Sequence, residues 1–209
     1  MFQSKHFEVF HQENVEDALN QIRRYVQSVL RKYGVRIQQQ VLEKTIYDHI
    51  PVHVAKHIRR KVTMPFNTWV AVGGDGRGYK KYCHLQLGIN RKYVFLVVAL
   101  IDHPPYEKEI MQAWQAKSAL LDDLPEDFVF IDDHTDYPWR PLKNMTMSEI
   151  VARAQEEHKC DTMIGRLIER EDMEAMESED FDAWVSETTD YLIPFLAAGR
   201  AVDLDMRGK

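Results

Sequence analysis

Cysteine is scarce in this sequence, whose 209 residues include only Cys83 and Cys160. The two lie far apart, and neither belongs to the closely spaced pairs that zinc sites use. In a reducing compartment two such thiols stay unpaired. The sequence therefore predicts no disulfide and no zinc site built on cysteine.

Long hydrophobic runs are also missing. The longest uninterrupted apolar stretch, 93–101, has about half the length that a helix needs to cross a bilayer. The first residues show no apolar segment after a basic start, so no secretory signal is predicted. These absences predict a cytoplasmic protein with no membrane partner.

Glycine and proline, with nine and eight residues, are too few for a disordered chain. The apolar share of 44% and the charged share of 29% are typical of soluble globular proteins. No linker, repeat or low-complexity tract divides the chain, and this length commonly forms one folded unit. The sequence predicts a single domain, 1–209.

Motifs that specify one chemistry are absent as well. The glycine-rich stretch 74–78 is followed by residues that alternate at period two, whereas a dinucleotide-binding motif requires a helix there. We interpret it as a hairpin turn whose backbone N–H groups could approach an anion. His53 and His57 are four residues apart, but no third ligand is signalled nearby. We therefore expect no metal and no cofactor.

Hydrophobic periodicity predicts both helices and strands. The expected helices are 14–33, 35–47, 106–121, 146–158 and 178–198. The first and last are expected to end at Gly34 and Gly199, and Thr146 with Glu149 forms a capping box. The expected strands are 68–72, 79–89, 93–101, 128–131 and 162–169, while 53–62 fits a helix or an edge strand.

The firm strand pairs are hairpins, so we predict an α+β fold. It consists of an antiparallel sheet of about five to six strands with helices packed on one side, a two-layer arrangement.

Charge is distributed unevenly along the chain. The segment 53–92 has nine basic residues against Asp75 alone, so it carries +8, while the remainder carries −14 of the net −6. Such a segment either forms a basic patch for phosphate-bearing ligands or docks on the acidic remainder.

A polar row runs along the expected strand 79–89. If 90–92 is a three-residue loop, His84 lies opposite Val98, Gln86 opposite Leu96 and Tyr82 opposite Leu100. Polar groups among apolar partners are typical of a ligand cleft, and also of a core histidine bonded to a neighbour.

Asp133 and His134 follow a short expected strand, where loops often carry chemistry. A carboxylate near an imidazole can form a general base, which requires a hydrogen-bonded partner for the ring. No Ser or Cys lies in a nucleophile motif such as GxSxG, so the pair is also compatible with a loop cap.

Several stretches resemble the YktB-like family of bacterial proteins of unknown function. The resemblance rests on HVAKHIRRKV (53–62), TWVAV (68–72), RGYKKYCHLQLG (77–88), YVFLVVAL (93–100), DFVF (127–130) and DHT (133–135). Cys83 and Leu85 occupy positions where the family has Pro and Phe. The resemblance implies a two-layer α+β fold, of which a topology like that of TATA-box-binding sheets is one form, in a cytoplasmic bacterial protein. It implies no catalytic residues.

Three functions follow from these patterns. The leading hypothesis is a binding protein for a small anionic, phosphate-bearing ligand, or for nucleic acid, through the basic hairpin 77–92 and the polar sheet face. The expected contacts are His57, Arg59, Arg77, Lys80, Tyr82, His84 and Gln86. The net charge of −6 disfavours nucleic acid. The alternatives are an enzyme that uses His84 with Asp133 or His134, and a protein-interaction module.

Overall fold

The structure, a computed structural model, describes residues 1–56, 64–117, 119–156 and 161–207. A seven-stranded sheet with order β1-β2-β3-β4-β7-β5-β6 organises the fold, and every neighbouring pair is antiparallel. The strands are β1 (Val52–Val54), β2 (Asn67–Gly73), β3 (His84–Asn90), β4 (Tyr93–Leu100), β5 (Val129–Ile131), β6 (Trp139–Pro141) and β7 (Thr162–Glu169).

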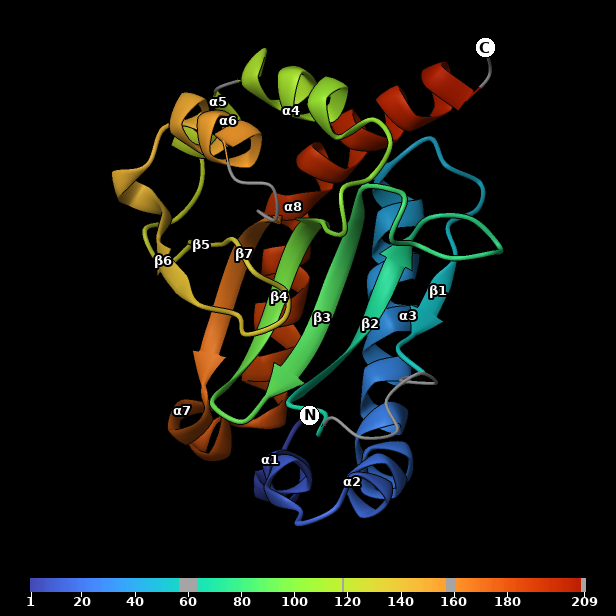
Figure 1. Ribbon diagram of the computed structural model, residues 1–209, viewed down its shortest axis with the longest axis vertical. Helices are drawn as coiled ribbons and strands as arrows, with labels where there is room; N and C mark the ends of the chain where they lie inside the picture. The colour runs from blue at the N-terminus through green and yellow to red at the C-terminus, as the bar shows by residue number, and fades with distance from the viewer. Residues whose placement is uncertain (57–63, 118, 157–160, 208–209) are drawn as a thin grey trace.

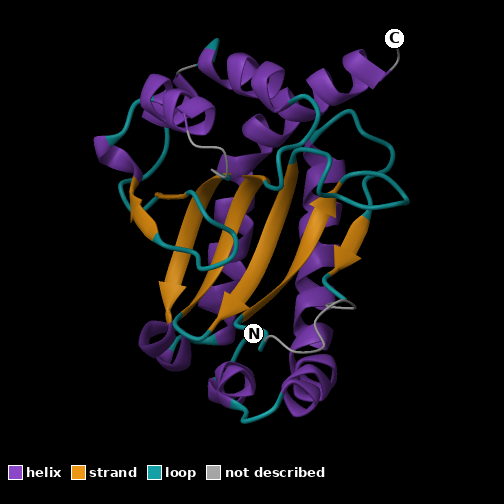
Figure 2. Ribbon diagram, in the orientation of Figure 1, coloured by secondary structure: helices purple, strands orange, loops and turns teal. Residues whose placement is uncertain are grey.

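Helices cover one face of this sheet and both of its ends (Figures 1 and 2). Behind the sheet lie α3 (Gln27–Lys44) and α8 (Ser178–Arg207). The ends carry α1 (Ser4–Glu8), α2 (Val15–Gln21), α4 (Glu107–Gln115), α5 (Ala119–Asp122), α6 (Met147–Glu156) and α7 (Arg170–Ala175). The loop between β5 and β6 crosses the opposite, open face (Figure 1). The α+β fold predicted from the sequence is confirmed, with β1 and β6 raising the strand count above five to six.

Two apolar clusters hold the sheet in place. The larger lies between the sheet and the helices and includes buried residues from Phe2 to Ala198. The smaller lies on the open face, around Phe95, Val97 and Tyr137. Because one cluster spans nearly the whole chain, we propose that 1–209 is a single domain. Among the described helices, none combines the length and apolar composition needed to cross a bilayer.

Two glycines do not end helices as predicted. The α2 helix continues through a π-helical turn (Ile22–Val26) into α3, so Gly34 lies inside a helix. A Cβ at Gly34 would lie 2.6 Å from Val70 Cγ2, and one at Gly199 would lie 2.6 Å from Cys83 Sγ. Both glycines therefore allow a helix to approach the sheet closely. The α8 helix does not end at Gly199 but continues to Arg207.

The predicted pairing of the central hairpin is wrong by one residue. His84 pairs with Ala99 and Gln86 with Val97, because the turn between β3 and β4 has two residues rather than three. The side chain of Asn90 closes this turn, since its Oδ1 accepts hydrogen bonds from Lys92 N at 2.7 Å and Tyr93 N at 2.9 Å. His84 and Gln86 consequently face the open side of the sheet.

The strand expected from residue 79 begins only at His84. Asp75 organises the preceding turn, where its Oδ1 accepts from Arg77 N and Gly78 N and its Oδ2 accepts from Tyr82 Oη at 2.6 Å. These bonds hold Tyr82 away from the polar sheet face. They also occupy two of the backbone N–H groups that could have met an anion.

The remaining elements follow the sequence more closely. The capping box is confirmed, because Thr146 N donates to Glu149 Oε2 at 2.6 Å and Glu149 N to Thr146 Oγ1 at 3.2 Å. The predicted helix 106–121 is divided into α4 and α5. Of the ambiguous segment 53–62, the first two residues belong to β1 and residues 57–62 lie outside the described residues.

Candidate functional site

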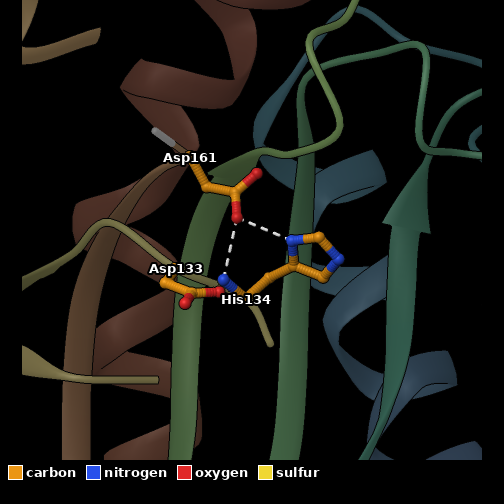
Figure 3. A group of neighbouring side chains, drawn as sticks. All are labelled: Asp133, His134 and Asp161. Atoms are coloured by element: carbon orange, nitrogen blue, oxygen red, sulfur yellow. Dashed lines mark hydrogen bonds and ion pairs between the residues drawn. The ribbon is translucent and has the colours of Figure 1, made fainter. Parts of the chain in front are cut away.

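The pairing of β5 with β7 brings His134 beside Asp161. Ile131 pairs with Met163, so the residues after β5 and before β7 emerge at the same edge of the sheet. Asp161 Oδ2 accepts a hydrogen bond from His134 N at 2.8 Å and lies 2.6 Å from His134 Nδ1. Figure 3 shows both contacts, with the imidazole extending away from Asp133. A carboxylate thus fixes the orientation of the ring.

Asp102, just after β4, completes this edge. Its backbone N donates to Asp161 Oδ1 at 3.0 Å, so both oxygens of Asp161 are occupied. The Asp102 Oδ1 lies 3.6 Å from His134 Nε2, and the other oxygen pairs with Lys80. Burial opposes ionisation of Asp102, but the hydrogen bond and charge of Lys80 lower its pKa overall. We call Lys80, Asp102, His134 and Asp161 the edge cluster.

Backbone strain occurs at Asp102 of the edge cluster and at its neighbour His103, whose φ values are 56° and 50°. Within the described ranges, the other non-glycine residue with positive φ is Tyr137 (57°), in the loop between β5 and β6. Such conformations cost free energy and occur often at functional sites. His103 Nδ1 lies 3.1 Å from the carboxyl group of Glu107, whose pKa is raised by burial. The strain therefore coincides with a group of titratable side chains.

The loop that carries His134 is anchored by ion pairs. Asp132 Oδ2 pairs with Arg140 and, at 2.9 Å, with Arg153 of α6. The Asp132 carbonyl accepts from Asp161 N at 2.9 Å. Because the Asp132 side chain is only 10% exposed, these charges hold the loop firmly before His134.

The group Asp133, His134 and Asp161 has the composition of a metal site, with one potential ligand atom from each within 4.8 Å of the others. The carboxylate oxygens of this group already accept hydrogen bonds. Asp133 Oδ1 accepts from Thr135 N at 2.7 Å and from Thr135 Oγ1 at 2.5 Å, and Asp161 Oδ2 accepts from His134 N. A cation at this position would displace those bonds. The hydrogen-bonded arrangement suits proton transfer better than metal ligation.

His84 lies in a buried polar chain rather than in the edge cluster. Its Nδ1 is 2.9 Å from the Tyr82 carbonyl, which only accepts, so Nδ1 carries the proton. Burial lowers the pKa of this fully buried imidazole to about 4, and Nε2 is therefore a lone-pair nitrogen that needs a donor. In the structure Gln86 Oε1 lies 3.3 Å from His84 Nε2, and Gln86 Nε2 donates to Tyr137 Oη at 2.6 Å. Because two lone pairs cannot form a hydrogen bond, we assign the Gln86 amide the opposite orientation, in which its NH₂ group donates to His84 Nε2 and its oxygen accepts from Tyr137 Oη.

With this orientation of Gln86, the ring nitrogens of His84 and the amide of Gln86 form hydrogen bonds without a ligand. The arrangement favours a structural histidine, which is the second of the two interpretations of the polar row.

Acid is expected to destabilise the fold through His84. Because its pKa is about 4 when folded and 6.5 ordinarily, the unfolded state binds the proton first as pH falls. Stability is therefore lost between about pH 6.5 and 4, by roughly 3 kcal/mol. Urea unfolding of the wild type and His84→Gln at pH 7 and pH 5 measures this share. If both proteins lose the same free energy of unfolding, His84 is not the group responsible.

The other predicted contacts do not form one site among the described residues. Tyr82 stacks on Arg207, whose guanidinium carbon lies 3.9 Å from the ring centroid, and Arg77 lies exposed in the turn before β3. His57 and Arg59 lie outside the described residues. Of the predicted set, Lys80 joins the edge cluster and His84 joins Gln86 in the buried chain.

The described basic residues of the segment 53–92 neither dock on the acidic remainder nor gather into one patch. Of its described basic residues, Lys80 alone forms an ion pair, whereas the others are exposed: Lys56, Arg77, Lys81, Arg91 and Lys92. Residues 77–81 and 91–92 lie at opposite ends of β3, roughly 20 Å apart at the usual rise per residue. Within the described ranges these charges form no single surface for a polyanion.

Three important residues had no signal in the sequence. Asp102, Tyr137 and Asp161 enter their contacts only through strand pairing across long sequence separations. The one weak indication is that Asp102 follows one expected strand and Asp161 precedes another. If two such strands pair antiparallel, these two residues come together.

Comparison with known proteins matches nearly the whole chain. The family model described as "Domain of unknown function (DUF1054)" matches residues 2–196. A UPF0637 protein of Lactococcus lactis subsp. cremoris is 34% identical over 93% of this chain and 96% of its own length. A UPF0637 protein of Enterococcus faecalis is 32% identical over 93% and 95%, and one from Listeria monocytogenes is 28% identical over 94% and 96%. The chain therefore belongs to the DUF1054 family of bacterial proteins of unknown function, as its resemblances predicted.

Proposed function

We propose that this protein is a cytoplasmic enzyme in which His134, oriented by Asp161, acts as the general base of a hydrolytic reaction. The contact that supports this is the 2.6 Å hydrogen bond between His134 Nδ1 and Asp161 Oδ2. It leaves Nε2 as the nitrogen that can accept a proton. The enzyme alternative of the sequence analysis is thus retained, with His134 rather than His84 as the base.

Water is the nucleophile that fits this arrangement. The hydroxyl group of Thr135, the residue that follows the base, already donates to Asp133. The buried Cys83 lies on the helix side of the sheet. The 3.6 Å gap between His134 Nε2 and Asp102 Oδ1 is too long for a direct hydrogen bond and suits a bridging water. His134 would take a proton from that water as its oxygen bonds to the acyl carbon or the phosphorus. The bond to the ester oxygen then breaks, and the proton passes from His134 to the leaving alkoxide.

Lys80 gives the edge cluster a positive charge. Its ammonium pairs with Asp102 and its side chain is 46% exposed, so Lys80 can approach a substrate. In an acyl or phosphoryl ester, negative charge develops on an oxygen in the transition state, and a nearby cation stabilises it. We therefore expect ester substrates.

A hydrolysis screen tests this proposal. The wild type and His134→Gln are assayed against p-nitrophenyl esters of carboxylic and phosphoric acids, with and without a chelator. At least one ester is expected to be cleaved by the wild type and spared by the variant, in the presence of chelator too. Equal rates for the two proteins across all esters would contradict a base at His134, and loss of wild-type activity with chelator would indicate metal ligation instead.

A further inference from the structure

A pocket of about 490 Å³ opens on the side of the sheet that carries no helices. It is lined by Tyr93 and Glu169, which pair across β4 and β7. Residues 136–138, Trp139 in β6 and Phe66 before β2 also line it. This volume lies in the range of small-molecule sites. The pocket is near the β3–β4 turn, at the end of the sheet opposite the edge cluster.

An exposed tryptophan marks the pocket. The Trp139 side chain is 43% exposed, whereas Trp69, Trp114 and Trp184 are at most 9% exposed. Trp139 lies beside Pro138 and near the buried ring of Tyr93. Large exposed aromatics are costly in water and are enriched where proteins bind ligands. The side chains of Trp139 and Pro138 therefore offer a surface on which a planar ring can stack.

The pocket is lined by charges of both signs. Arg91 and Lys92 supply two positive charges, and Asp136 and Glu169 supply two negative charges. In the part of the chain that the structure describes, none of the four forms an ion pair, and the contact of Arg91 is a 3.0 Å hydrogen bond from Nε to a backbone carbonyl. Four charged groups next to an aromatic wall thus keep their capacity for a partner.

We propose that this pocket binds a small aromatic zwitterion, an amino-acid-like molecule with a planar ring, an ammonium group and a carboxylate. The ring would lie on Trp139 and Pro138. The ammonium would meet Asp136 and Glu169, and the carboxylate would meet Arg91 and Lys92. A phosphate ester would be repelled by the two acids, so a ligand with both charges matches the lining better.

Fluorescence of Trp139 offers a direct test, since the other tryptophans are buried. L-Phenylalanine, which does not absorb where tryptophan is excited, is titrated while iodide quenching is measured. We expect phenylalanine to protect Trp139 from iodide with saturation in the millimolar range or below. Phenethylamine, 3-phenylpropionate and glycine each lack one of the three groups and should bind about tenfold more weakly or worse.

Matched variants assign each charge. Glu169→Gln should weaken the binding of phenylalanine and phenethylamine but leave that of 3-phenylpropionate unchanged. Lys92→Gln should weaken the binding of phenylalanine and 3-phenylpropionate but leave that of phenethylamine unchanged. Lys5→Gln, an exposed change outside the pocket, controls for net charge. Thermal unfolding of each variant confirms the fold.

No protection by phenylalanine up to about 10 mM would overturn the proposal, and so would an analogue that lacks one charge yet binds equally well. His134→Gln should retain full binding. The pocket and the proposed hydrolysis can therefore fail separately.

Discussion

Replacing Asp161 by Asn should lower the turnover of a cleaved ester by roughly 10²–10⁴-fold, with KM little changed. The amide has nearly the shape of the carboxylate but lacks its negative charge, and its NH₂ group must face either His134 N or Asp102 N, both of which donate to Asp161. The imidazole would then lose the charge that orients it and that stabilises its protonated form during proton transfer. His134→Gln, which removes the base, should reduce kcat to a similar extent.

The control for this prediction is His49→Gln, because His49 is exposed and lies apart from the edge cluster. Its kcat should equal that of the wild type. The double variant Asp161→Asn with His134→Gln should be no slower than His134→Gln alone, since Asp161 acts through the imidazole. Additive losses would show that Asp161 contributes independently of His134.

Gly165→Ala should destabilise the fold by about 3 kcal/mol, which corresponds to a fall in Tm of roughly 6–12 °C. Gly165 lies inside β7, where a Cβ would come 2.0 Å from Leu96 O and 2.6 Å from Val97 Cα. Both are backbone atoms of β4, so space can be made only by separating two paired strands.

Gly76→Ala is the matched control, because a Cβ at Gly76 meets nothing within 4 Å and its φ is not positive. Its free energy of unfolding should stay within about 0.5 kcal/mol of the wild type. Thermal unfolding of the three proteins measures both effects. Equal Tm values for Gly165→Ala and Gly76→Ala would show that β4 and β7 lie farther apart than described.

The strands were more predictable than the contacts between them. An apolar run such as 93–101 predicts a buried strand from composition alone, and β7 begins and ends as its residues indicate. Strand pairing depends instead on the length of one turn. The bonds of the Asn90 side chain make that turn two residues long, so His84 pairs with Ala99 rather than with Val98 as predicted.

Glycines show a second limit of sequence patterns. A glycine after an amphipathic run is typical of a helix end, yet Gly34 and Gly199 lie inside helices. What selects glycine there is the distance to Val70 and to Cys83, far away in the chain. Such a distance exists only after the helices pack on the sheet.

The sequence predicted two of the four residues of the edge cluster, Lys80 and His134, as site residues. The adjacent Asp133 and His134 suggested a base and its carboxylate, but the partner of the ring is Asp161. That pair forms because β7 lies between β4 and β5, although β5 precedes it in the chain. Strand order of this kind leaves no local trace in the residues themselves.

The tautomer of His134 tests the central claim most directly. Long-range ¹H–¹⁵N correlation spectra at about pH 8, with ¹⁵N-labelled histidine and His134→Gln for assignment, distinguish the two ring nitrogens. The account predicts a protonated, hydrogen-bonded Nδ1 and a lone-pair Nε2 for His134 in the wild type, with the Nδ1 hydrogen bond weakened in Asp161→Asn. A His134 that carries its proton on Nε2, or whose spectrum is unchanged in Asp161→Asn, would contradict it.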